Sequence, residues 1–138
     1  MNDDLILCTN DNTPYFSIEG EHICKCVSVY DGDTITVAIK FVEFNKIYKF
    51  RIRLLGIDAP EIKSKNEDEK KKAVLVRDYL RSNVLDKIVK LKCEKFDKYG
   101  RLLAWVYLLN SDKSVNDILI EKKYAKPYDG GAREPYQN

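Results

Sequence analysis

The sequence predicts an α+β fold, a five-stranded OB-fold β-barrel with one helix between strands three and four and a short C-terminal helix. Three observations lead to this prediction. Five segments of strand length alternate apolar and polar residues and are rich in β-forming side chains. One longer segment has its apolar residues at helical spacing instead. The order of three strands, a helix and a closing pair of strands is that of such a barrel.

The first three strands are predicted in the N-terminal half of the chain. Residues 22–30, "HICKCVSVY", alternate, and "DGDT" then interrupts the pattern with an Asp-Gly turn signal. Residues 34–41 and 47–57 form the second and third strands, which are joined by a long hairpin. Residues 13–20 are weakly periodic and could add an edge strand.

The main helix is predicted over residues 73–84. Asn66 or Ser64 could cap its start, with acidic residues in the first turn. The lysine run at 70–72 is interpreted as a solvated face, with DNA contact as the alternative. One face of the helix carries the apolar residues Ala73, Val76, Leu80 and Val84.

The C-terminal part supplies the closing strands and the second helix. Residues 88–96 and 102–109 read as strands, joined by "DKYG". Ser114 and Asp117 have the spacing of a capping box and begin a short helix in "VNDILIEKKYA". Its inward residues are expected to be Val115, Ile118 and Leu119. The tail "KPYDGGAREPYQN" is rich in glycine and proline and is expected to be loop.

The whole chain has the size of a single domain. It has 138 residues, of which 44% are hydrophobic and 33% charged, with a net charge of +2. We expect an N-terminal extension (1–21), one domain (22–128) and a C-terminal tail (129–138). The small net charge excludes a polybasic binder, so any nucleic-acid role requires a local arrangement of charge. No signal peptide or membrane span is visible, which predicts a cytoplasmic protein of unknown source with no membrane partner.

Cysteine and histidine usage restricts the chemistry further. The four cysteines show no disulfide framework, so free thiols are expected. A metal site at Cys24 and Cys26 is the weaker alternative to two buried or surface thiols. With His22 as the single histidine, a multi-histidine zinc site or a pair of catalytic histidines is excluded. The chemistry must therefore use carboxylates, arginines, lysines and tyrosines.

Three short stretches at strand ends hold the unusual polar residues: "DGDT" (31–34), "RLLGIDAPE" (53–61) and "DKYGR" (97–101). In a small barrel such ends lie close together. Their carboxylates are Asp31, Asp33, Asp58 and Glu61, and their basic residues include Arg53 and Arg101.

This set of residues matches the requirements of phosphodiester hydrolysis. Clustered carboxylates repel one another, and a hard cation such as calcium relieves the repulsion. Arginines bind phosphate oxygens in a bidentate manner. A remaining carboxylate can activate water, while the metal and arginines offset the charge that builds on phosphorus. Each stretch alone is also compatible with an ordinary turn or with exposed strand charges.

Taken together and in this order, "YDGDT", "RLLGIDAPE" and "DKYGR" resemble the staphylococcal nuclease (thermonuclease) family. The resemblance extends from about residue 22 to about residue 128. It implies an OB barrel with helices that cleaves DNA and RNA with calcium.

The resemblance also implies a metal site. Asp33 and Asp58 match the calcium-binding aspartates of the family. Ala59 matches the residue whose backbone carbonyl binds calcium, and this role does not depend on the side chain. Asp31 matches an acid that supports the metal through the groups that bind it.

The remaining matches concern phosphate and substrate. Glu61 matches the proposed general base, and Arg53 and Arg101 match the two phosphate-binding arginines. Arg51 falls outside the pattern and is interpreted as an exposed strand charge. Either Tyr124 or Tyr128 could line the substrate pocket. Substrate contacts are predicted for Lys98, Tyr99 and Tyr128.

The predicted function is therefore a calcium-dependent endonuclease that acts on DNA and RNA, prefers single strands, leaves 3′-phosphates and works as a monomer. The alternative is a non-catalytic nucleic-acid- or protein-binding OB module. A copy that had lost its catalytic function should lack some of the matched residues, and this chain has them all. A small interaction barrel with accidental turn acids is the third hypothesis, against which the three ordered motifs argue.

Overall fold

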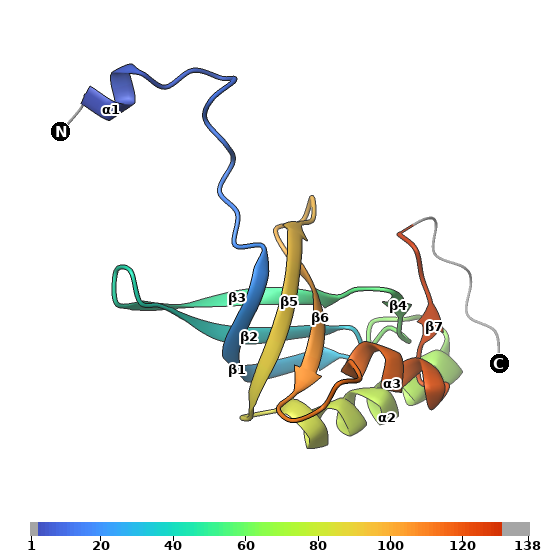
Figure 1. Ribbon diagram of the computed structural model, residues 1–138. Helices are drawn as coiled ribbons and strands as arrows, with labels where there is room; N and C mark the ends of the chain where they lie inside the picture. The colour runs from blue at the N-terminus through green and yellow to red at the C-terminus, as the bar shows by residue number, and fades with distance from the viewer. Residues whose placement is uncertain (1–2, 131–138) are drawn as a thin grey trace.

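The computed structural model, which describes residues 3–130, confirms the predicted five-stranded barrel (Figure 1). The strands close in the order β1-β2-β3-β6-β5. Neighbours are antiparallel except for β3 and β6, which pair in parallel and close the barrel. Their bounds are β1 Gly20–Asp31, β2 Thr34–Phe41, β3 Lys46–Leu54, β5 Ile88–Phe96 and β6 Leu102–Leu108.

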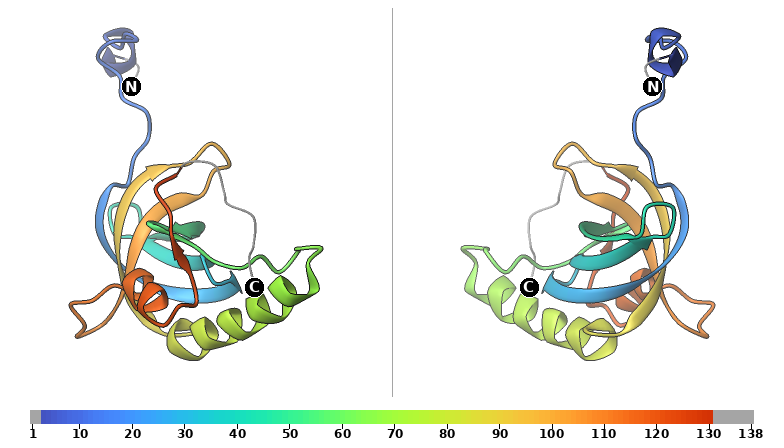
Figure 2. Two further views of the ribbon diagram at one scale, coloured as in Figure 1. Left: turned by 90° about the vertical axis from the view of Figure 1, so that its right-hand side faces the viewer. Right: turned by 90° about the vertical axis from the view of Figure 1, so that its left-hand side faces the viewer.

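The other elements lie outside the barrel wall. Figure 2 shows α2 below the barrel and the N-terminal segment extending away from it. The short strands β4 and β7 pair beside the end of β3. Their bounds are α1 Asp3–Ile6, β4 Ile57–Asp58, α2 Glu67–Val84, α3 Val115–Glu121 and β7 Lys126–Pro127. Within residues 3–130, no helix combines the length and the apolar character needed to cross a membrane.

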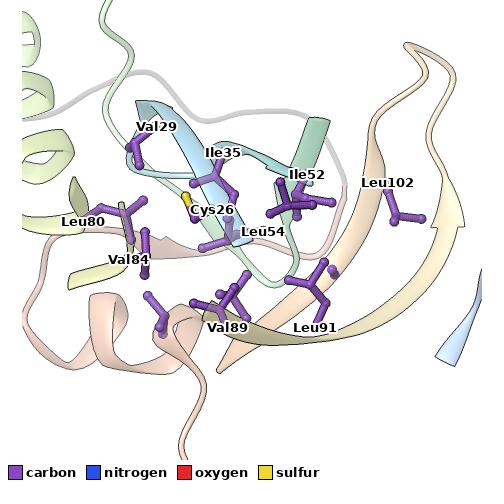
Figure 3. Packing of buried hydrophobic residues seen from close by; sticks show 14 of the residues in the cluster. Cys26, Val29, Ile35, Ile52, Leu54, Leu80, Val84, Val89, Leu91 and Leu102 are labelled. Atoms are coloured by element: carbon purple, nitrogen blue, oxygen red, sulfur yellow. The ribbon is translucent and has the colours of Figure 1, made fainter. Parts of the chain in front are cut away.

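The core is built from the inward-facing residues of all five strands and from one face of α2 (Figure 3). Leu80 and Val84 of α2 point toward Cys26, Ile35 and Leu54 of the barrel. Complete burial of each aliphatic side chain contributes about 1.5–3 kcal/mol. Leu80→Ala would leave a cavity at a cost of about 2–5 kcal/mol. Because α2 is anchored in this way, it provides a rigid support for the loops at one end of the barrel.

Helix α2 begins six residues before the predicted start. The Asn66 side chain caps it by accepting a hydrogen bond from the Glu69 backbone N–H at 3.0 Å. The polar run Glu67–Lys72 therefore forms the first turns of the helix, because the cap supplies the signal that apolar spacing lacks. The predicted apolar face, from Ala73 to Val84, is buried as expected.

Several predicted boundaries were wrong. Residues 13–19 form no strand, and β1 begins at Gly20. Strand β3 ends at Leu54 because Gly56 turns the chain with φ +79°. A side chain at Gly56 would also collide with the Trp105 ring, 2.7 Å from the position of a Cβ. Helix α3 ends at Glu121, before Lys123 takes a positive φ of 61°.

Candidate active site

The turn between β1 and β2 places two aspartates in the protein interior. Asp31 and Asp33 are only 6% and 7% exposed. A Cβ on Gly32 would lie 2.6 Å from Cγ1 of Val76 and 2.8 Å from Cβ of Ala59. Only glycine allows the turn to pack this closely against α2 and the segment that follows β4. The glycine of "DGDT" therefore serves tertiary packing as well as the turn.

Asp33 joins segments that are far apart in the sequence. Its Oδ2 accepts a hydrogen bond from the Ala59 backbone N–H at 3.0 Å, across 26 residues of sequence. Its Oδ1 accepts one from the Thr34 hydroxyl at 3.1 Å. Arg53 Nη1 lies 3.5 Å from Asp33 Oδ2. The β1–β2 turn, β3 and the exit of β4 thus meet at one carboxylate.

Asp31 feels the cost of this arrangement. Burial, followed by the negative charge of Asp33, raises the pKa of Asp31 to about 8. The Asp33 backbone N–H, which donates to Asp31 Oδ1 at 3.2 Å, and the Arg53 charge oppose the increase without cancelling it. Two neighbouring buried carboxylates therefore lack sufficient positive charge from the described residues.

Arg53 is held in place from two sides. Its Nη1 donates to the Leu54 carbonyl at 2.8 Å, and its side chain is 13% exposed. The ring of Tyr128 lies over the guanidinium, with 5.7 Å from Cζ to the ring centroid. The Tyr128 N–H donates to the Gly56 carbonyl at 2.9 Å, which ties β7 to the exit of β3. Of the two candidate tyrosines, Tyr128 lies on the site residue. Tyr124 instead packs edge-on to Tyr79 at 5.0 Å against the core.

Asn116 holds the exit of β3, and sequence reasoning missed it. It is fully buried, whereas the expected inward residue Ile118 is only half-buried. Its Nδ2 donates to the Leu55 carbonyl at 2.7 Å and to the Ala104 carbonyl at 3.3 Å. Its Oδ1 accepts from the Val106 N–H at 3.0 Å. A polar residue next to the apolar positions of a short helix was the available signal.

Glu69 organises the loop that carries Glu61. This glutamate is only 3% exposed, and its oxygens accept from the Glu61 N–H at 3.0 Å and from the Ser64 hydroxyl at 2.7 Å. The loop is thereby folded back onto the start of α2, while the Glu61 residue itself is exposed. Sequence reasoning treated Glu69 as one of several first-turn acids. Its spacing of three residues from the Asn66 cap was the signal that set it apart.

Arg101 belongs to a second group on the β5–β6 hairpin. Its Nε donates to Asp97 Oδ2 at 2.8 Å, and Asp97 Oδ1 accepts from the N–H groups of Tyr99 and Arg101 at 2.9 Å each. Burial alone would raise the pKa of Asp97, but these backbone donors and the Arg101 guanidinium outweigh it and lower the pKa. The Tyr99 ring lies 5.3 Å from Lys98 Nζ and 5.6 Å from Arg101 Cζ.

The predicted residues thus fall into two groups joined by the sheet. Contacts unite the first group, which consists of Asp31, Asp33, Arg53, Ala59 and Tyr128. The second group consists of Lys98, Tyr99 and Arg101. Arg53 lies opposite Leu103 in the parallel β3–β6 pair, so strand alternation puts Arg53 and Arg101 on the same outer face. Asp58 lies beside the first group, opposite Lys126 in the β4–β7 pair.

The donor chemistry of the first group suits a hard cation. Asp33, Asp58 and the Ala59 carbonyl offer only oxygen atoms, and the shortage of positive charge at Asp31 favours a cation nearby. Among residues 3–130, no three or more His, Cys, Asp or Glu side chains form a ready metal cluster. A cation here would thus depend on the backbone carbonyl and on further oxygen ligands.

The cysteines take no part in the site. All four are free, and Cys24, Cys26 and Cys93 are buried. Burial raises the pKa of Cys24 to about 12 and those of Cys26 and Cys93 to about 11. These thiols therefore stay protonated and act as small apolar core residues.

Comparison with known proteins identifies relatives. Residues 51–138 match the family described as staphylococcal nuclease homologue. The chain is 30% identical to the uncharacterized protein MJ1439 of Methanocaldococcus jannaschii, over 86% of this chain and 65% of that protein. It is 32% identical to an "uncharacterized endonuclease" of Escherichia coli O157:H7, over 80% of this chain and 64% of that protein. A protein of the same description from Haemophilus influenzae is 33% identical, over 83% and 57%.

Two features of these matches bear on the site. The chain spans less than two thirds of the length of each of these relatives. The family match begins at residue 51 and so covers the second and third motifs but not "DGDT". The contact between Asp33 and Ala59 connects "DGDT" to the matched region.

Proposed function

Because the chain belongs to the staphylococcal nuclease homologue family, we propose that it is a calcium-dependent endonuclease that hydrolyses DNA and RNA and leaves 3′-phosphates. One observation carries the proposal. The Asp33 carboxylate contacts Arg53 and the Ala59 backbone N–H, which brings the oxygen donors next to a phosphate-binding arginine. The two relatives described as endonucleases support the reaction class.

Calcium would be held by Asp33, Asp58 and the Ala59 carbonyl, with Asp31 supporting Asp33. When bound, it would offset negative charge on the phosphate and relieve the repulsion between the two buried aspartates. Oxygen-only donors and the raised pKa of Asp31 support this assignment. The chelator experiment below tests it.

The protein's own side chains would do the remaining work. Arg53 would donate hydrogen bonds to a non-bridging phosphate oxygen, with its guanidinium held by the Leu54 carbonyl and the Tyr128 ring. Arg101 would bind a second oxygen from the neighbouring strand, and Lys98 and Tyr99 would contact a terminal phosphate. These donors stabilise the charge that develops as water attacks phosphorus.

Glu61 would accept the proton of the attacking water. The water oxygen bonds to phosphorus, the bond to the 5′ oxygen breaks, and that oxygen leaves with the electron pair and takes a proton from solvent. The phosphate then remains on the 3′ oxygen. Glu61 suits this task because it is exposed, on a loop that Glu69 holds at its backbone.

The experiment is incubation of the purified protein with single-stranded DNA and with RNA, with millimolar calcium, with magnesium, and with a chelator. Calcium should support cleavage. Magnesium should support it poorly because it demands octahedral geometry and retains its waters. End-group analysis should find 3′-phosphates. Full activity in the chelator would refute calcium dependence, and binding without cleavage in any metal would leave the non-catalytic OB module.

A further inference from the structure

Strand β3 carries a row of basic side chains that leads away from the candidate active site. Lys49, Arg51 and Arg53 occupy alternate positions on its outer face, while Ile52 and Leu54 between and beyond them point into the core. Lys49 and Arg51 are exposed, and Arg53 is the mostly buried residue at the site. We call Lys49, Arg51 and Arg53 the basic row.

The neighbouring strand leaves the basic row uncovered. In the β2–β3 pairing, Arg53 lies opposite Thr34, Arg51 opposite Thr36 and Lys49 opposite Ala38. These partners are small and uncharged, so they neither neutralise nor screen the row. Lys40, further along the same face of β2 and exposed, adds another positive charge.

The outer members of the row also have no acidic partner within the described part of the chain. Among residues 3–130, neither Lys49 nor Arg51 has a carboxylate oxygen within 4.0 Å. Arg53 and Arg101 differ, because they lie next to Asp33 and Asp97. An exposed charge that no internal pair requires is available for an external anion.

The spacing of the basic row suits one extended polynucleotide strand. Alternate residues on a strand are about 6.6–6.8 Å apart, which is close to the interval between phosphates in an extended single strand. Strands 2 and 3 of OB barrels commonly form the nucleic-acid-binding face. A single line of charges that ends at the mostly buried Arg53 matches one flexible strand better than a rigid duplex.

We propose that Lys49 and Arg51 bind successive backbone phosphates of a single-stranded nucleic acid, next to the phosphate that Arg53 binds. The inference rests on the proposed function and adds a substrate track to it. The track runs from the site along β3 toward the β2–β3 hairpin, which projects from the barrel (Figure 1). It would make affinity depend on substrate length on that side of the cleaved bond.

The test compares Lys49→Gln/Arg51→Gln with the control Lys70→Gln/Lys71→Gln, which removes the same charge from α2. Binding of a fluorescent oligothymidylate is measured in a chelator, so that cleavage does not interfere. The row variant should bind about tenfold more weakly at low salt, the scale of two exposed ion pairs. Its plot of log K against log salt should lose about 1.4 from the slope, or 0.7 for each phosphate contact. The control should keep the wild-type affinity and slope.

A charge-preserving variant, Lys49→Arg/Arg51→Lys, should restore both quantities, which would show that the charge and not a change in folding is responsible. Equal losses in the row variant and the control would mean bulk attraction and would overturn the proposal. A wild-type slope in the row variant would overturn it too. Equal competition by a duplex would overturn the single-strand assignment.

The two proposals fail in different ways. If the wild-type protein binds the oligonucleotide through the row but never cleaves it, the nuclease proposal fails and the track remains. If the protein cleaves with calcium but the row variant binds like the wild type, the track fails and the nuclease proposal remains.

Discussion

The two candidate phosphate-binding arginines are held by different kinds of structure. Arg101 is held inside one hairpin, by Asp97 four residues earlier. Arg53 depends on distant segments: Asp33 from the β1–β2 turn, Tyr128 from the chain after β7, and a strand exit held by Asn116, which lies 61 residues from Leu55. The Arg101 group is thus local, whereas the Arg53 group exists only once the barrel has closed.

The largest expected effect is on catalysis, where both groups should matter equally despite their different construction. Arg53→Lys and Arg101→Lys keep the charge but lose the fork that meets two phosphate oxygens. Each should lower kcat by about a hundredfold or more, the scale of losing one transition-state donor. Steady-state kinetics on single-stranded DNA measures this, with Arg77→Lys on α2 as the control. A wild-type rate for Arg101→Lys would mean that only the Arg53 group acts.

Glu61→Gln tests the water-activating role separately. The amide cannot accept the proton of water, so kcat should fall by about a hundredfold, within the range for general-base catalysis. Glu67→Gln, an exposed neighbour on α2, is the control. Unchanged turnover in Glu61→Gln would contradict the assignment of this residue as the base.

Asn116→Ala should separate the two groups by their dependence on the barrel. The change leaves the Leu55 and Ala104 carbonyls and the Val106 N–H without their side-chain partner. The free energy of unfolding should fall by about 3 kcal/mol, the range for buried groups left unsatisfied. The half-buried Asn83→Ala, which removes a bond to the Tyr79 carbonyl, should cost much less.

Denaturant unfolding measures both asparagine variants. Chemical shifts of the Asp97–Arg101 hairpin should stay close to wild type in Asn116→Ala, while those around Arg53 change. Equal changes in both places would break the distinction between a local and a tertiary group.

Ligand-dependent melting should be confined to the Arg53 group. Calcium at a hundredfold excess over its Kd should stabilise the fold by about 2.7 kcal/mol and raise Tm by roughly 5 °C. A nucleotide bisphosphate should add to this shift, because its phosphates engage the arginines. Asp33→Ala should remove most of the calcium-dependent part, whereas Asp97→Asn should retain it. A wild-type melt that neither ligand moves would contradict a metal site among these aspartates.

The smallest expected effect is the pH dependence of the hairpin. The pKa of Asp97 is lowered in the folded protein, so its contribution to stability is present above the unfolded value of about 3.9 and is lost as the pH falls through the folded value. Asp97→Asn should therefore destabilise the protein at neutral pH, and the difference from wild type should shrink in acid. Urea unfolding between neutral and acidic pH measures this, with the exposed Asp112→Asn as the control. A difference that does not change with pH would contradict the charged role of Asp97.

Much of the fold could be predicted from local patterns. The bounds of β2 and β5 were predicted correctly, because alternation and turn residues define them within a few positions. The buried face of α2 and the caps at Asn66 and Ser114 were likewise visible. The Arg101 hairpin belongs with these features, since its hydrogen bonds join residues at most four apart.

The rest depended on contacts between distant segments. Periodicity shows which side of an element is buried but not which residue it meets, so spacing alone could not choose Tyr128 over Tyr124 or reveal the role of Asn116. The sequence by itself determined the strands, the helix caps and the local Arg101 hairpin, because short-range spacing and hydrogen bonding encode them. Only the tertiary structure decided that Asp33, Arg53 and Ala59 meet, because closure of the barrel brings their strand ends together.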